Sequence, residues 1–146
     1  MQFTFSTLAS AFLVALHAVD SVSAAAVALK HRSVVSKQDM LDWIATTEAN
    51  VTFIGNPIAK RADGTTVVYC TKRTNNVCGG DCTVFTGSAK CLDTDGTNCI
   101  SATTNVGFCD KGGCGGSCNQ FSSCGTKLDN NFCATPGTKS INVPFA

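Results

Sequence analysis

Histidine, glutamate and tryptophan are absent from residues 62–146, the C-terminal part of this 146-residue sequence. Their absence excludes Ser-His-Asp and Cys-His nucleophilic catalysis, histidine-based ribonuclease chemistry and histidine-ligated catalytic metal sites from this part of the chain. Six aspartates balance six lysine or arginine residues there, so its net charge is near zero. A neutral domain is a poor nucleic-acid binder and a poor cationic membrane-disrupting peptide. We therefore expect a non-enzymatic protein with no cofactor, no metal and no nucleic-acid partner.

Two of the aspartates, Asp93 and Asp95, are close enough in the sequence to suggest a site. They could imitate the carboxylate pair of a glycosidase or the first ligands of a calcium loop. Cys99 interrupts the calcium pattern, and no ligand-rich segment follows it. A solvated turn around Asp95-Gly96 is the simpler interpretation.

Long apolar runs are also scarce. The stretch from Leu8 to Val19 is apolar but too short for a stable membrane anchor. Small residues follow it, with Val22 and Ala24 placed as in an A-x-A-like cleavage site. We expect residues 1–24 to be a secretory signal peptide, although its start lacks lysine and arginine; a buried apolar helix is the alternative. No other run reaches membrane-spanning length, so no stable membrane insertion is expected.

A second boundary is expected at Lys60-Arg61, because every cysteine follows it and none precedes it. Asn56-Pro57 and Asp63-Gly64 flank the pair and indicate an exposed turn-rich linker. The pair resembles the Lys-Arg processing site of fungal secretory-pathway endoproteases, which cut after the arginine. We expect a pro-segment at residues 25–61 and a mature domain at residues 62–146. An ordinary surface Lys-Arg pair is the alternative.

The predicted pro-segment contains one plausible helix. Ser36 and Asp39 fit a variant of the capping box, and an apolar stripe follows at Met40, Leu41, Trp43 and Ile44. A helix of this length is marginal unless it packs on something, so it either covers the mature domain during folding or is a spacer. The spacer is the favoured interpretation. The sequence also has a glycosylation sequon here, at Asn50-Val51-Thr52.

Ten cysteines among the 85 residues of 62–146 are typical of a disulfide scaffold. A domain this small buries too little apolar surface to be stable comfortably, and each bridge contributes roughly 2–4 kcal/mol. A redox site would need C-x-x-C, which the sequence lacks, and oxidised thiols cannot bind a metal. We expect all ten to form disulfides: Cys70, Cys78, Cys82, Cys91, Cys99, Cys109, Cys114, Cys118, Cys124 and Cys133.

The cysteines fall into two diverged repeats, at about residues 67–105 and 106–146. CGGDC at Cys78–Cys82 matches CGGSC at Cys114–Cys118, and the five cysteines of each copy follow in the same order. Five is an odd number, so full oxidation requires an odd number of bridges between the repeats. If the copies packed about a pseudo-twofold axis with equivalent bonding, one such bridge would join a cysteine to its own counterpart. The connectivity itself cannot be read from the sequence.

The expected fold is a small disulfide-rich domain, mainly β and loop, built from two five-cysteine repeats with pseudo-twofold symmetry. Strands are expected near residues 65–69, 83–85, 100–104, 106–108 and 140–143, where β-branched and aromatic residues cluster. Turns are expected at Asp95-Gly96, residues 111–113 and Pro136-Gly137, and at the glycine pairs of both CGG-x-C motifs.

Aromatic residues recur in both repeats, as Tyr69 with Phe108 and Phe85 with Phe121; Phe132 and Phe145 occur in the second repeat alone. Such rings could stack on sugars, as in small chitin-binding domains. A shared hydrophobic core is the favoured interpretation, because phenylalanine prefers burial.

The signal peptide, Lys-Arg site and CGG-x-C repeats together resemble fungal small secreted cysteine-rich proteins, many of which act as effectors. The resemblance implies a secreted, extracellular protein, in the host apoplast if it is an effector. Its role would be virulence or host interaction through a host or microbial protein that the sequence does not identify. The alternatives are a cell-wall polysaccharide-binding module for chitin or glucan and an antimicrobial toxin.

Overall fold

The computed structural model describes residues 34–56 and 64–144, all within one compact unit, Arg32–Ala146. The predicted signal peptide, the Lys60-Arg61 site and Phe145 lie outside the described residues. The described elements, in chain order, are α2 (Lys37–Thr46), β1 (Asn50–Gly55), β2 (Thr65–Thr74), β3 (Val77–Gly87), β4 (Lys90–Ala102), β5 (Gly107–Cys109), β6 (Cys118–Gln120), η2 (Phe121–Ser123), η3 (Asp129–Asn131) and β7 (Cys133–Val143).

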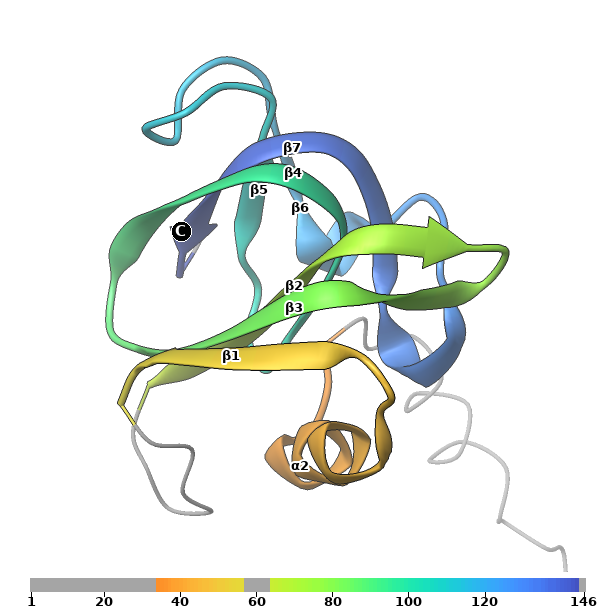
Figure 1. Cartoon of the computed structure of the whole chain (residues 1–146). Coiled ribbons are helices and arrows are strands. Elements are labelled where there is room, and N and C mark those ends of the chain that lie inside the picture. The colour runs from red at the N-terminus through yellow and green to blue at the C-terminus, as the bar shows by residue number, and fades with distance from the viewer. Residues whose placement is uncertain (1–33, 57–63, 145–146) are drawn as a thin grey trace, which may run out of the picture. The chain divides into compact units, whose positions relative to one another are not determined.

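The strands form one sheet in the order β1-β3-β2-β4-β7-β5-β6. β1 runs parallel to β3, and all the other neighbouring strands are antiparallel. The long strands β4 and β7 curve together across the molecule (Figure 1). The prediction of a small, disulfide-rich, mainly β domain is therefore confirmed.

Each of the five predicted strand segments overlaps an observed strand, but the observed strands are mostly longer. Three predicted turns are wrong, because Gly79-Gly80 lies inside β3, Asp95-Gly96 lies inside β4 and Pro136-Gly137 lies inside β7. The pairing register shifts at each of these positions, and Gly80, Gly96 and Gly137 have φ values of 80°, 84° and 81°. Turn-forming residues in these positions make bulges that bend the strands without ending them.

Alternate residues of β2 and β3 enter two separate hydrophobic clusters, as the period of two in a strand requires. Val68 and Val84 belong to one cluster, with Leu128 and Phe132. The other cluster contains Val67, Phe85, Leu92, Val106, Phe121 and Ile141, with Tyr69 and Phe108 partly buried against it. The repeated aromatic residues therefore form core, as the sequence favoured.

The segment before β2 is part of this fold. The helix is confirmed as α2, and the hydroxyl of its N-cap Ser36 accepts a hydrogen bond from the backbone N–H of Asp39 at 3.0 Å. Val35 and Met40 are buried in the cluster of Val68 and Val84. The β1 strand then extends the sheet beside β3 (Figure 1). The spacer interpretation is wrong, because the apolar side chains of this segment pack against one face of the sheet.

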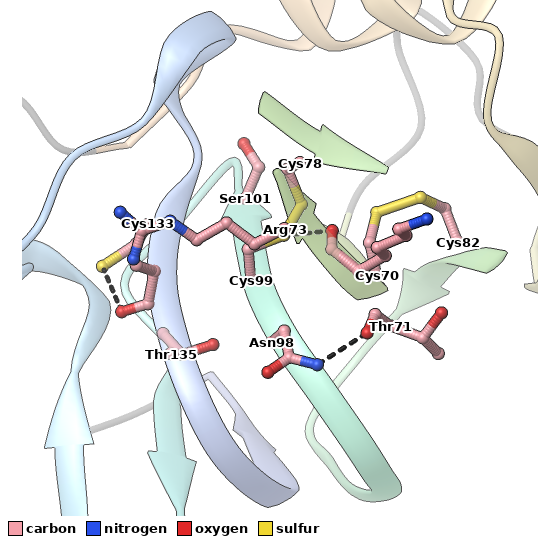
Figure 2. The surroundings of a disulfide bond; sticks show 12 residues. Cys70, Thr71, Arg73, Cys78, Cys82, Asn98, Cys99, Ser101, Cys133 and Thr135 are labelled. Carbon is pink, nitrogen blue, oxygen red and sulfur yellow. Dashed lines mark hydrogen bonds between the residues drawn. A yellow bond between two sulfur atoms is a disulfide. The ribbon is translucent and has the colours of Figure 1, made fainter. Parts of the chain in front are cut away.

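All ten cysteines lie among the described residues, and none is free. The five disulfides are Cys70–Cys82, Cys78–Cys99, Cys91–Cys114, Cys109–Cys118 and Cys124–Cys133. Figure 2 shows the first two side by side, near Asn98, whose amide donates to the carbonyl oxygen of Thr71 at 2.6 Å. The predicted full oxidation is confirmed.

One disulfide, Cys91–Cys114, joins the predicted repeats, so the expected odd number of crossing bridges is also confirmed. It connects the fourth cysteine of one repeat to the second cysteine of the other. The remaining cysteines then cannot pair alike in both copies, and equivalent bonding is wrong. Two bridges do occupy matching positions, from the first to the third cysteine of each predicted repeat: Cys70 lies directly opposite Cys82 on β2–β3, and Cys109 lies directly opposite Cys118 on β5–β6.

Candidate binding groove around Trp43

Trp43 is the only tryptophan of the chain, and it lies half-buried on α2. Its ring contacts the ring of Phe132, with centroids 4.9 Å apart and planes inclined by 57°. Trp43 also lines two hollows in the surface, of about 410 Å³ and 300 Å³. The hollows share Trp43, Thr46 and Asn130, and we call them together the Trp43 groove.

The lining of the Trp43 groove comes from both parts of the chain. The larger hollow is lined by Trp43, Thr46, Thr47, Glu48, Ala49, Val77, Cys78, Gly79, Gly80 and Asn130. The smaller one adds Asp39, Asp42 and Asn131. Among these described lining residues, three are acidic and none is basic. The groove therefore offers one indole, exposed carboxylates and amides, and glycine backbone.

Local sequence explains how these groups come together. Ser36 caps α2 and starts the helix one residue later, so Trp43 falls on the same face as the buried Met40. Asn130 and Asn131 have φ values of 56° and 60° in η3, a left-handed conformation that asparagine tolerates better than most residues. Gly80 has a φ of 80° within β3, where the register to β2 shifts.

The arrangement is suited to binding. Apolar C–H faces of a ligand can pack on the indole while carboxylates and amides accept and donate hydrogen bonds around it. Anionic ligands are disfavoured by the acidic side chains. The pKa shift resolved among the described groups is at Tyr69, which belongs to the other hydrophobic cluster; burial raises this pKa and a hydrogen bond with Thr83 opposes the rise.

The structure places the predicted site residues as follows. Asn50 is exposed at the start of β1, and its amide nitrogen donates to Asp81 Oδ1 at 3.0 Å. Asp93 accepts a hydrogen bond from the backbone of Gly113 at 3.0 Å, and Asp95 accepts one from Gly96 at 3.1 Å. Both aspartates thus hold backbone in place. Within residues 34–56 and 64–144, no group of three His, Cys, Asp or Glu residues is arranged to hold a metal ion.

Sequence reasoning missed the Trp43 groove. The signal was present, as a lone tryptophan on an amphipathic stripe, but Trp43 falls in the segment interpreted as a spacer. Gly79 and Gly80 were expected to serve the disulfides alone. Only the docking of α2 brings these residues together.

In comparisons with protein families, curated proteins and solved structures, the chain matches none. In the part of the chain that the structure describes, the helices are too short or too polar to cross a membrane.

Proposed function

We propose that this chain is a secreted, non-enzymatic interaction protein, with the role of a virulence or host-interaction effector. The observation that carries the proposal is the pairing of all ten cysteines. Such dense disulfides persist in oxidising compartments, and they give a small domain resistance to unfolding and proteolysis outside the cell. The fungal origin, the processing at Lys60-Arg61 and the glycan at Asn50 are parts of the same proposal.

The test is exposure of candidate host tissue to the purified, correctly oxidised secreted protein. A host response such as altered immune signalling or cell death is expected, and reduced and alkylated protein should lose it. Growth inhibition of microbes without any host would favour the antimicrobial alternative. Substrate turnover by the purified protein would overturn the non-enzymatic role.

Binding of cell-wall polysaccharide is a second candidate, and the Trp43 groove favours it. Neutral sugars present C–H faces to aromatic rings and hydroxyl groups to carboxylates and amides. Pulldown on insoluble chitin and β-glucan tests this function. Retention should fall at least severalfold in Glu48→Gln and Asn130→Gly, and should stay unchanged in Asp95→Asn, which removes a matched exposed acid elsewhere. Absence of retention on both polymers would remove this candidate.

The repeat origin of the fold is a further part of the proposal, and the strand registers support it. Tyr69 pairs with Ile100 as Phe108 pairs with Ile141. Apart from β1, the strand order is also symmetric about the β4–β7 pair, with β2 and then β3 beyond β4, and β5 and then β6 beyond β7. Thr97 pairs with Thr138, and the proposed pseudo-twofold axis passes between them. The order of the cysteines in the sequence matched Cys99 with Cys133. If Thr97 and Thr138 are counterparts, Ser140 and not Cys133 is the residue equivalent to Cys99. A nuclear Overhauser contact between the backbones of Thr97 and Thr138 would support this register; its absence would contradict it.

A further inference from the structure

The segment from Val35 to Asn56 is held to the cysteine-rich part along its whole length. Near its start, Val35 N–H donates to the carbonyl oxygen of Ala102 at 2.9 Å. At its end, Asn56 N–H donates to the carbonyl oxygen of Thr86 at 2.8 Å. Between them, β1 keeps a continuous six-residue register with β3, from Asn50–Asp81 to Gly55–Thr86. We call residues 34–56 the cover segment.

The cover segment also supplies a large share of one hydrophobic cluster. Its contributions are Val35 and Met40, which are 6% and 3% exposed, and the partly buried Trp43, Ile44, Ala49 and Val51. Opposite them lie the nearly inaccessible Val68, Val84 and Phe132, at 0%, 1% and 3% exposure. Without the cover segment these side chains would face water and the β3 edge would lose its partner strand, both at a cost in free energy.

No covalent bond other than the backbone joins the cover segment to the rest. The first cysteine is Cys70, so the five disulfides all lie beyond the predicted cleavage after Arg61. A cut there would leave the strand pairing and the shared cluster to hold the two pieces. The expectation that residues 62–146 alone are the mature protein ignores this interface.

We infer that the cover segment stays bound after cleavage at Lys60-Arg61, so that the processed protein is a noncovalent complex of two chains. The Trp43 groove then belongs to the two-chain form, because Trp43 and Thr46 come from the cover segment while Gly79 and Asn130 come from the cysteine-rich chain. This inference rests on the proposed processing at Lys60-Arg61 and does not depend on the ligand.

The experiment uses the oxidised, secreted chain and an endoprotease specific for Lys-Arg. Denaturing, non-reducing electrophoresis should show release of the N-terminal piece without reductant. Lys72-Arg73 lies in β2, and a cut there would leave pieces joined by Cys70–Cys82. If the protease does not cut at Lys60-Arg61, the same experiment is done on a variant with a longer cleavable linker inserted between Lys60 and Arg61.

The cut sample is then passed through size exclusion under native conditions at micromolar concentration. Because Trp43 is the only tryptophan, indole fluorescence follows the cover segment. The expected result is more than nine-tenths of the fluorescence in the domain peak, with both masses found in that peak by native mass spectrometry. Elution of the indole as a separate peptide would overturn the inference.

A pair of variants separates specific retention from slow diffusion or aggregation. Met40→Ala removes a buried side chain of the cover segment, and should raise the dissociated fraction of the cut protein at least tenfold. Ala45→Gln changes an exposed position of α2 and should leave retention unchanged. Folding of each variant is checked on the uncut chain, in which the cover segment is tethered. Equal retention of both variants would contradict the interface.

Discussion

Gly80 and Gly116 hold matching positions in the two CGG-x-C motifs, with φ values of 80° and 75°. A Cβ added to Gly80 would lie 2.7 Å from Cβ of Lys72, and one added to Gly116 would lie 2.9 Å from Cγ of Lys111. At both motifs the backbone folds closely over the lysine two residues after the first cysteine of the predicted repeat, and at Gly116 the carboxylate of Asp110 lies closer still. The second glycine of each motif is therefore required for backbone conformation and for space.

Alanine substitution should have different effects on stability at the two glycines of the first motif. Gly80→Ala is expected to lower the free energy of unfolding by roughly 1–3 kcal/mol, because it combines a left-handed residue with a steric clash. Gly79→Ala should change stability little, since a Cβ there meets nothing within 4 Å and its φ is not positive. Chemical denaturation of both oxidised variants measures the difference. Equal stability of the pair would contradict this account.

Tyr69 is the only tyrosine, so its ionisation can be followed alone. Burial raises its pKa above the ordinary value of 10.0, and the hydrogen bond with Thr83 lowers it by less. Folding thus favours the protonated phenol, and its contribution to stability is complete below pH 10 and is lost as pH rises through the folded-state pKa. Phenolate absorbance should show a higher midpoint in folded than in unfolded protein. The alkaline loss of stability should be smaller in Tyr69→Phe.

At the scale of elements, β1 is the exposed end of the sheet. No strand among the described residues pairs with its outer side, and Phe53 and Ile54 are 58% and 40% exposed. The strand NVTFIG carries no lysine, proline or charge, the usual devices that keep an edge strand from pairing with another molecule. The sequon at Asn50 lies on this strand, where a glycan would shield the edge.

Loss of this glycan should therefore promote self-association. Thr52→Ala removes the sequon but keeps Asn50 and its hydrogen bond to Asp81, whereas Thr52→Ser keeps the sequon. In a glycosylating host, light scattering should find dimers or larger species of Thr52→Ala and monomers of Thr52→Ser. Adding Phe53→Lys to Thr52→Ala should restore the monomer. A monomeric Thr52→Ala that lacks the glycan would contradict the shielding role.

At the scale of the whole molecule, Cys91–Cys114 ties β4 to the loop between β5 and β6. Neighbouring hydrogen bonds hold the same loop, from Gly113 N–H to Asp93 of β4 at 3.0 Å and from Cys114 N–H to Ser140 Oγ of β7 at 2.9 Å. The bridge spans 23 residues, whereas Cys109–Cys118 spans 9 and joins residues that are already paired across two strands.

Removing these two bridges should therefore have unequal effects. Replacing both Cys91 and Cys114 by alanine is expected to cost roughly 3 kcal/mol, about 1 kcal/mol more than the same change at Cys109 and Cys118. The difference arises because the longer loop restricts the unfolded chain more. Denaturant titration of the two double variants, each with the other four bridges intact, provides the measurement. A larger loss from the shorter bridge would contradict the entropic explanation.

The fold was predictable where the information is local. The α2 helix followed from Ser36 and the apolar stripe behind it, and most strand segments followed from clusters of β-branched residues. The turns expected at Gly96 and Gly137 were wrong. A glycine with positive φ either ends a strand or only bends it, and the outcome depends on whether a partner strand continues the pairing beyond it, which the local sequence does not show. The Trp43 groove was not predictable, since its walls are far apart in the sequence.

By itself the sequence determined that this chain needs sulfur to hold its shape, that all ten cysteines pair, and that an odd number of bridges joins the two groups of five. These conclusions rest on composition and parity, which no folding can change. Only the tertiary structure decided which cysteines pair and that residues 34–56 complete the sheet. Those outcomes depend on which distant segments bury each other's apolar faces, and burial is a property of the folded chain.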